Sequence, residues 1–163
     1  MIVIDYTVRH SEINAAGMGI FVKFDIPRGT VISAPDGIQK LYKVDEINLM
    51  SPESVEYTSS VRWFEDYYSF VSGWDDECYY NHSFDPNCIW HLGFVFAARD
   101  LAAGTEITID YAHLLEEGTE SMFTDSKTGK RVVGMSFRDS IAKSASALAE
   151  IYKRSPGTVA KTS

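Results

Sequence analysis

Short stretches of alternating apolar and polar residues run through the first 113 residues, and turns containing Gly or Pro separate them. This two-residue period predicts short β-strands. The predicted strands cover residues 1–8, 20–24, 30–33, 67–71, 92–98 and 105–111. Segment 92–98 is apolar throughout, which predicts a strand buried on both faces. The pattern as a whole predicts a mainly β domain with short helices.

The spacing changes to a helical one in two places. Within residues 38–62, the apolar side chains Leu41, Val44, Ile47 and Met50 follow a loose helical period, and Ser51-Pro52-Glu53 suits the start of another helical turn. The polar segment 116–134 predicts a loop.

A C-terminal helix of about 137–154 is predicted after this loop. Ser136 would cap it, with Asp139 three residues later as a partner of the capping-box type. Its apolar face would consist of Ile141, Ala145, Leu148 and Tyr152. Ser155-Pro156-Gly157 would end it.

Length and composition narrow the class of protein. The 163 residues suffice for one domain with a hydrophobic core. No apolar run approaches the ~20 residues that span a bilayer, and the N-terminus lacks the basic and apolar regions of a secretory signal. Two cysteines give no disulfide framework. We therefore expect a reducing intracellular compartment, the cytoplasm, or the nucleus for a eukaryotic protein or one acting on host chromatin, with no membrane partner.

Charge is divided unevenly along the chain. Residues 1–126 contain 7 basic and 21 acidic residues, a net charge of −14, whereas residues 127–163 have a net charge of +6. An acidic body argues against nucleic acid as the main partner, because phosphate binding needs clustered Lys and Arg. It would attract a cationic substrate. A merely soluble acidic surface explains the same charge.

Three short segments carry the candidate chemistry. They are Gly17-Met18-Gly19, Asn81-His82-Ser83-Phe84-Asp85-Pro86-Asn87-Cys88 and Gly104-Thr105-Glu106-Ile107-Thr108-Ile109-Asp110-Tyr111. The glycines let backbone approach a ligand closely. The second segment places two hydrogen-bonding side chains together before a turn. The third predicts a strand that delivers a tyrosine to its end.

In order and spacing, these segments resemble the signatures of the SET-domain family of protein lysine methyltransferases, over about residues 5–113. The resemblance implies a SET-type β fold with a C-terminal pseudoknot, in which the last strand threads through a loop, followed by the α-helix. It implies a SET domain at 1–113 and an extension at 114–163 that packs on the domain or completes it.

The same resemblance implies a cofactor and a reaction. The cofactor is S-adenosylmethionine (AdoMet), and the reaction is methyl transfer to a lysine ε-amine of a protein substrate, which we expect to be basic. Tyr111 would be catalytic and would also contact AdoMet. The other expected cofactor-binding residues are Gly17, Met18, Gly19, Asn81, His82, Phe123 and Phe137, the last two as alternatives for stacking on adenine.

A lysine channel completes the expected site, with Tyr68, Trp90 and Ile109 as candidate residues. Free lysine has a pKa of about 10.4, so an apolar channel helps by favouring the neutral amine. The family often has Phe or Tyr where Ile109 stands, and Trp90 is also unusual, so the number of methyl groups transferred stays open. The assignment of the second channel tyrosine to Tyr67 or Tyr68 also stays open.

Two alternatives remain at this stage. The first is a catalytically inactive module of the same fold that binds AdoMet or a lysine-rich tail. The second is a zinc-stabilised interaction domain, because Cys78, His82, Cys88 and His91 lie within 14 residues. Their interleaved order differs from the usual Cys2His2 arrangement of paired ligands, and we predict no metal.

Overall fold

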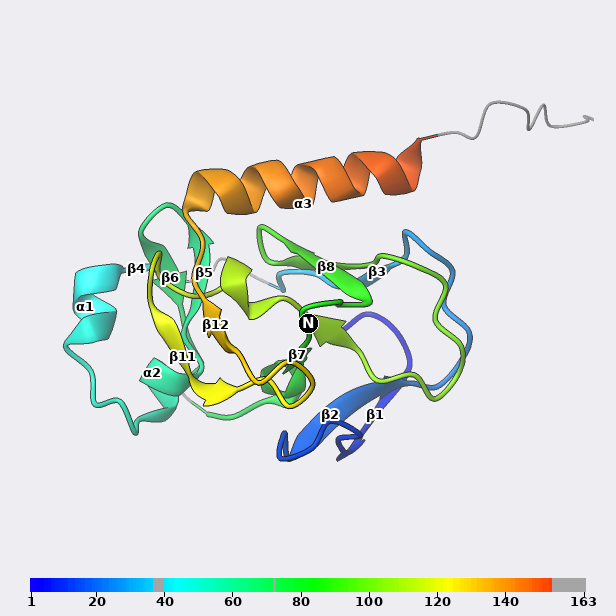
Figure 1. Ribbon diagram of the computed structural model, residues 1–163, viewed down its shortest axis with the longest axis horizontal. Helices are drawn as coiled ribbons and strands as arrows, with labels where there is room; N and C mark the ends of the chain where they lie inside the picture. The colour runs from blue at the N-terminus through cyan, green and yellow to red at the C-terminus, as the bar shows by residue number, and fades with distance from the viewer. Residues whose placement is uncertain (37–39, 72, 154–163) are drawn as a thin grey trace, which may run out of the picture.

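The computed structural model describes residues 1–36, 40–71 and 73–153, and its strands form several small sheets (Figure 1). The strands are β1 (Tyr6–His10), β2 (Met18–Val22), β3 (Val31–Ser33), β4 (Tyr42–Lys43), β5 (Val61–Phe64), β6 (Tyr67–Ser69), β7 (Asn81–His82), β8 (Cys88–His91), β9 (Phe94–Ala97), β10 (Thr108–Ile109), β11 (Glu120–Thr124) and β12 (Arg131–Val133). The helices are α1 (Val44–Asn48), α2 (Val55–Thr58) and α3 (Phe137–Tyr152), with 3₁₀ turns η1 (Asp76–Tyr79) and η2 (Tyr111–His113).

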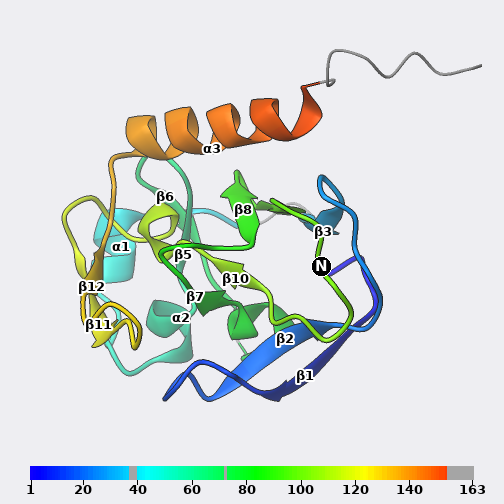
Figure 2. The same ribbon diagram turned by 45° about the vertical axis from the view of Figure 1, so that its right-hand side comes forward.

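Sheet pairing brings distant segments together. The three-stranded sheets have the orders β3-β9-β8 and β4-β6-β5, and β1 pairs with β2. The second and third signature segments, 81–88 and 104–111, meet through β7 and β10. These strands pair in parallel with Thr108 opposite Asn81 and Ile109 opposite His82 (Figure 2). This pairing places the last strand of the SET-like region beside the Asn-His pair, as the expected pseudoknot requires. The mainly β prediction is confirmed.

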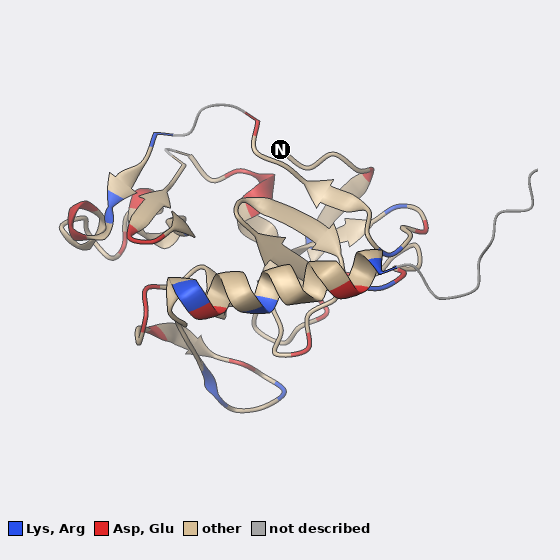
Figure 3. Cartoon of the chain, turned by 90° about the horizontal axis from the view of Figure 1, so that it is seen from above, with Lys and Arg blue, Asp and Glu red and all other residues tan. Residues whose placement is uncertain are grey.

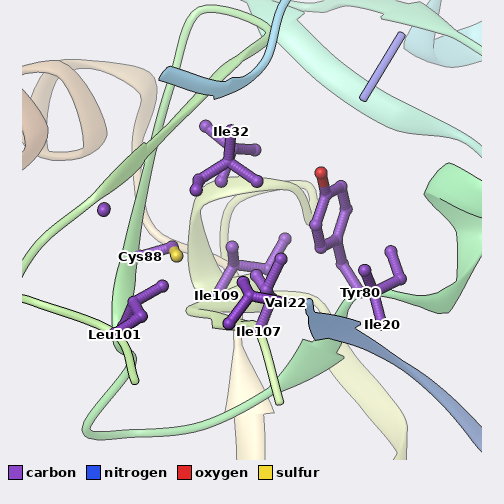
Figure 4. Close-up of a cluster of buried hydrophobic side chains, with 10 residues drawn as sticks. Ile20, Val22, Ile32, Tyr80, Cys88, Leu101, Ile107 and Ile109 are labelled. Carbon is purple, nitrogen blue, oxygen red and sulfur yellow. The ribbon is translucent and has the colours of Figure 1, made fainter. Parts of the chain in front are cut away.

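The core lies where these small sheets face one another. Its buried members include Ile20 and Val22 of β2, Ile32 of β3, and Ile107 and Ile109 of the third signature segment (Figure 4). Alternate apolar residues of short strands therefore face this core, and β2 is buried on its other face as well, through Phe21. The backbone amide of Ile107 donates to the carbonyl of Ile20 at 2.8 Å and joins this segment to β2.

The predicted strands form with shorter or displaced bounds; the strand predicted at 20–24 lies at Met18–Val22, and the one predicted at 67–71 ends at Ser69. The first begins at Tyr6, while Ile2 makes only a single bridge to Ser33. The strand predicted at 105–111 is reduced to Thr108–Ile109, because Asp110 ends it by capping the turn η2. In the region 38–62, both helical turns form, but the second starts at Val55. Its cap is Ser54, whose Oγ accepts from the Tyr57 amide, rather than Ser51.

Segment 92–98 is not buried on both faces, so that prediction is wrong. Leu92 and Gly93 have φ of 50° and 83° and turn the chain between β8 and β9. Phe94 is 38% exposed, whereas Val95 and Ala97 are fully buried. The apolar run therefore contains a hairpin turn followed by β9, the central strand of the β3-β9-β8 sheet, which is exposed on one face at Phe94. Composition alone does not distinguish this arrangement from a strand buried on both faces.

Segment 116–134 is not a loop either. It forms an antiparallel hairpin of β11 and β12, with Glu120 opposite Val133 and Thr124 opposite Arg131. Val132 is fully buried and Ser121 is 3% exposed. The Ser121 hydroxyl accepts from the Val132 amide at 3.0 Å. Because the hairpin buries few side chains, its sequence lacks the strong alternation that would reveal it.

The C-terminal helix begins as predicted. Ser136 caps α3 by accepting from the Asp139 amide. The predicted apolar face is wrong in part, because Ala145 is exposed and Tyr152 is 59% exposed. Ser140 and Ser144 are the buried residues of the helix. Their hydroxyls contact His113 and His91 of the body. The buried face of the helix therefore differs from the expected apolar face. The expected end at Ser155-Pro156-Gly157 lies outside the described residues.

Helix α3 lies across the body next to β8 and η2 (Figure 1). Helix α3 carries both basic and acidic residues, and the acidic residues of the body lie almost entirely outside its strands, in helical turns and loops (Figure 3). Within the part of the chain that the structure describes, no helix has the length and apolar character needed to cross a membrane.

Candidate active site

One cavity of about 620 Å³ is lined by residues of the second and third signature segments, of the hairpin β11–β12 and of the loop that precedes Gly17. Asn81 and His82 of β7 line it together with the preceding Tyr80, and Tyr111 lines it from η2. Its volume lies in the range of about 300–1,000 Å³ that is typical of small-molecule sites. The structure thus brings the Asn-His pair and the candidate catalytic tyrosine to the same space.

Tyr111 is held at both ends. Its backbone amide donates to His82 Nδ1 at 3.2 Å, and its hydroxyl donates to the Tyr80 carbonyl. The Phe123 ring meets its ring edge-on at 5.8 Å. Burial raises the pKa of the Tyr111 hydroxyl above its ordinary value. The hydroxyl therefore stays protonated, donates to Tyr80 and keeps oxygen lone pairs for another donor.

His82 is buried, with an exposed fraction of 5%. Because Nδ1 accepts from the Tyr111 amide, the ring proton is assigned to Nε2. Nε2 is buried and has no hydrogen-bond partner in the part of the chain that the structure describes. Burial lowers the pKa of His82, although Asp110 works in the opposite direction, so the ring is neutral near pH 7. A buried donor without a partner is costly unless a ligand or water satisfies it.

Glu106 joins the glycine segment to the Asn-His segment. Its carboxylate accepts from Ser11 Oγ at 2.6 Å, the Glu12 amide at 2.9 Å and Asn81 Nδ2 at 2.8 Å. Asn81 Nδ2 also donates to the Met18 carbonyl at 2.9 Å. The Asn81 amide is therefore used within the protein, and it fixes the backbone of the glycine segment beside β7.

The two glycines of this segment have different requirements. Gly17 has a φ of +78°, which L-residues with a side chain rarely adopt. Gly19 lies against Glu106, where an added Cβ would stand 2.3 Å from Oε1. Gly17 is needed for the turn, and Gly19 for the close approach of the buried carboxylate.

The three candidate channel residues lie at the same cavity. Tyr68, Trp90 and Ile109 all line it. Tyr68 and Ile109 are 4% and 2% exposed, and burial raises the pKa of Tyr68 to about 12. An apolar wall of this kind favours the neutral form of an amine.

Comparison with known proteins decides the family. The model of the SET domain matches residues 17–112, which is more than half of the chain. The chain belongs to the SET-domain family.

A solved structure described as "Structure of ctPRC2 in complex with H3K27me3 and H3K27M" matches this SET domain with a TM-score of 0.56 and 18% sequence identity. The match covers 81% of this chain and 16% of the other chain, so it supports the fold alone. A comparison with curated proteins gave no match. SET domains are typically protein lysine methyltransferases that use AdoMet.

The residues present fit AdoMet at the cavity in two respects. The unpartnered His82 Nε2–H is a donor for a polar ligand atom. The ring centroids of Phe84, Tyr111 and Phe123 lie 4.5, 5.5 and 6.1 Å from that of His82. These aromatic rings are suited to contact a flat heterocycle. Phe123 lines the cavity.

Some of the predicted cofactor residues lie elsewhere. Gly17, Met18 and Gly19 are not part of the cavity wall, to which the preceding residues Ile13–Ala16 contribute instead. Phe137 is the first residue of α3 and does not line the cavity. Of the two tail aromatics, Phe123 is therefore the better placed to contact a ligand beside His82.

The four residues of the zinc alternative are not brought together. Cys88 is buried in the hydrophobic core, and His91 Nδ1 contacts Ser144 Oγ at 2.8 Å. Cys78 Sγ contacts Asp75, and His82 Nδ1 accepts from Tyr111. Across residues 1–36, 40–71 and 73–153, no three His, Cys, Asp or Glu side chains are placed to hold a metal ion together.

The sequence reasoning missed three residues that shape this site. Tyr80 supplies the carbonyl that receives the Tyr111 hydroxyl, Glu106 holds the glycine segment, and Asp110 caps the turn of Tyr111. Glu106 and Asp110 stand within the third signature segment. Acidic residues at such positions signal a possible buried acceptor, but only the fold shows which donors surround them.

Proposed function

We propose that this SET domain transfers a methyl group from AdoMet to the ε-amine of a lysine in a protein substrate. The observation that carries the proposal is the position of Tyr111, whose hydroxyl is fixed at the wall of a cavity that Asn81 and His82 also line. The family membership sets the expected chemistry, and this geometry supports its presence in this chain.

In this mechanism the protein mainly binds, orients and excludes water. When bound, AdoMet supplies an activated methyl group next to the lysine amine. His82 Nε2–H would donate to a polar atom of the cofactor, and Phe123 would pack against its flat part. Asn81 acts through Met18 and Glu106 by fixing the loop at the cavity. Binding both partners in one orientation removes much of the entropic barrier.

Tyr111 orients the amine. Its hydroxyl donates to the Tyr80 carbonyl, so its remaining lone pairs would be free to accept from the amine N–H and to contact the methyl group that AdoMet supplies. The buried walls formed by Tyr68 and Ile109 favour the neutral amine, which is the nucleophilic form.

A cationic protein segment is the proposed substrate. The cavity lining includes the acidic residues Asp36, Asp75, Glu77, Glu116 and Glu120. These carboxylates attract lysine-rich segments at long range. The structural neighbour is described as a complex with H3K27me3 and H3K27M, which supports a lysine-containing tail as the substrate class. We also propose a reducing intracellular compartment, because the two cysteines of the sequence give no disulfide framework.

The test is incubation of the protein with labelled AdoMet and a mixture of basic proteins, followed by mass spectrometry of the labelled product. Tyr111→Phe removes one oxygen and keeps the ring, so methyl transfer is expected to fall by about 10²-fold or more. AdoMet affinity should stay within about threefold of wild type, because the hydroxyl bonds to Tyr80 in the free protein.

Calorimetry separates cofactor binding from turnover. Asn81→Ala and His82→Ala are each expected to weaken AdoMet binding by about ten- to hundredfold, since each leaves a buried partner unsatisfied. A protein that binds AdoMet and methylates nothing would be the inactive module. Near-normal turnover in a folded Tyr111→Phe variant would end the catalytic assignment.

A further inference from the structure

The turn that carries Tyr111 is fixed by a buried carboxylate. Asp110 is 7% exposed and is the N-cap of η2, where its Oδ1 accepts from the Ala112 amide at 3.0 Å. The Tyr111 side chain leaves the backbone within this turn. The direction of the Tyr111 ring therefore depends on the Asp110 cap.

The other oxygen of Asp110 is bound from the C-terminal helix. Lys143, in the middle of α3, donates from Nζ to Asp110 Oδ2 at 2.8 Å. The Lys143 side chain is 59% exposed and that of Asp110 only 9%, so Lys143 covers the side of the carboxylate that would otherwise face water. Asp110 Oδ1 also lies 3.9 Å from His82 Nδ1, the acceptor for the Tyr111 amide.

The same turn receives three further contacts. His113 Nδ1 contacts Ser140 Oγ of α3 at 2.8 Å, and the Met135 amide donates to the Ala112 carbonyl at 3.0 Å. Arg62 of β5 donates to the His113 carbonyl at 3.2 Å. Met135, Ser140 and Lys143 all follow residue 112, at which the match to the SET-domain model ends.

We infer that α3 positions the catalytic tyrosine, and that Lys143 is the positioning residue that acts on Tyr111 through Asp110. This inference rests on the proposed function for its effect on turnover. Without Lys143, the Asp110 carboxylate loses its charged partner and turns toward the space that the lysine covered. The Ala112 amide then loses its acceptor, and the Tyr111 hydroxyl is no longer held at the place that the amine requires.

The variant Lys143→Met keeps the apolar stem of the side chain and removes its charge. We expect kcat for methyl transfer to fall by about five- to tenfold, because small displacements of a positioned group are costly in rate. The KM for the protein substrate and the Kd for AdoMet should stay within about twofold, since Lys143 does not line the cavity. Lys143→Arg should restore most of kcat, because a guanidinium can also bind the carboxylate.

The matched control is Lys153→Met. Lys153, the C-cap of the same helix, forms an ion pair with Glu150 near the end of α3. Its loss should leave kcat unchanged. A fall in kcat of the same size in both variants would show a general effect on α3 and would overturn the positioning role of Lys143.

Hydrogen exchange of the Ala112 amide, followed by NMR, gives a readout that does not need activity. We expect exchange of this amide to be about five- to tenfold faster in Lys143→Met, and unchanged in Lys143→Arg and Lys153→Met. If wild-type protein transfers no methyl group, the proposed function fails and the exchange rate alone decides the inference. Unchanged Ala112 exchange in Lys143→Met overturns the inference, whether or not the protein is active.

Discussion

The signature segments and the C-terminal extension are held by different kinds of contact. In the signature segments, buried side chains bond to backbone. Asn87 is 7% exposed, donates to the Glu106 carbonyl at 2.7 Å and accepts from the Thr108 amide at 2.8 Å. In the extension, the contacts of α3 with the turn η2 and with Asp110 run between side chains, those of Ser140 with His113 and of Lys143 with Asp110.

This difference shows two levels of control over one site. The bonds of Asn87 and Glu106 satisfy backbone groups that cannot reach water, so the fold of the cavity depends on them. The contacts of α3 reach the cavity only through η2 and Asp110, and one partner of the Lys143 pair is half exposed. Changes in the first region should therefore affect stability, and changes in the second should affect the position of Tyr111.

Asn87→Ala should have the largest effect. It leaves the Glu106 carbonyl and the Thr108 amide without their buried partner, at a cost of about 4 kcal/mol in the free energy of unfolding. Urea denaturation measures this cost. Asn48→Ala, which alters an exposed contact at the end of α1, is the matched control and should change stability by less than about 0.5 kcal/mol. Equal losses of stability in Asn87→Ala and Asn48→Ala would show that the buried bonds of Asn87 do not stabilise the signature segments more than an exposed contact does.

Acid should weaken the junction between the two regions. Burial lowers the pKa of His113 to about 4; the nearby Lys143, Arg62 and His91 also lower it, while Asp110 raises it. Between an ordinary value of about 6.5 and about 4, the unfolded chain takes a proton that the folded chain does not. Stability should therefore fall as pH drops through this window, by about 3 kcal/mol from this residue.

The pH effect is measured by urea denaturation from pH 7 to pH 4, comparing wild type with His113→Asn. The asparagine can still bond to Ser140 but does not titrate in this range. The variant should lose less stability than wild type over the window. Parallel curves for the two proteins would show that carboxylates, rather than His113, cause the dependence.

Gly19→Ala tests the close approach in the signature region. The added Cβ meets a carboxylate that three donors hold, so either the bonds of Glu106 or the position of β2 must change. We expect a loss of about 2 kcal/mol in stability and weaker AdoMet binding in calorimetry. Gly73→Ala is the control, because its added Cβ meets nothing within 4 Å. No loss at Gly19 would mean that Glu106 is free to move.

Ser144→Ala should have the smallest effect. Ser144 is 2% exposed, and its hydroxyl bonds to His91 Nδ1 at 2.8 Å. Ser146 on the same helix is exposed, so Ser146→Ala reports the gain in helix propensity alone. The free energies of unfolding derived from the melting transitions should differ by about 1 kcal/mol between the two variants, with Ser144→Ala the less stable. Indistinguishable transitions would show that this bond does not anchor α3.

The mainly β class and the SET-domain family could both be predicted from the sequence alone. The spacing of Gly17, Gly19, the Asn81-His82 pair and Tyr111 placed three segments in the order of a SET domain. The cap at Ser136 was also predictable, because a cap depends on residues only three positions apart. These features are encoded locally, in side-chain types and short-range spacing.

The contacts between segments became known only from the folded chain. The hairpin β11–β12 and the buried face of α3 depend on which distant groups pair with them. An apolar pattern predicts an element only where apolar side chains are buried. Ser140 and Ser144 are buried because they make polar contacts, so no apolar pattern predicts their burial. The partners of Glu106 and Asp110 were hidden for the same reason. An Asp or Glu residue is written the same way in the sequence whether its carboxylate faces water or accepts from three donors. Only the fold distinguishes the exposed carboxylate from the buried one.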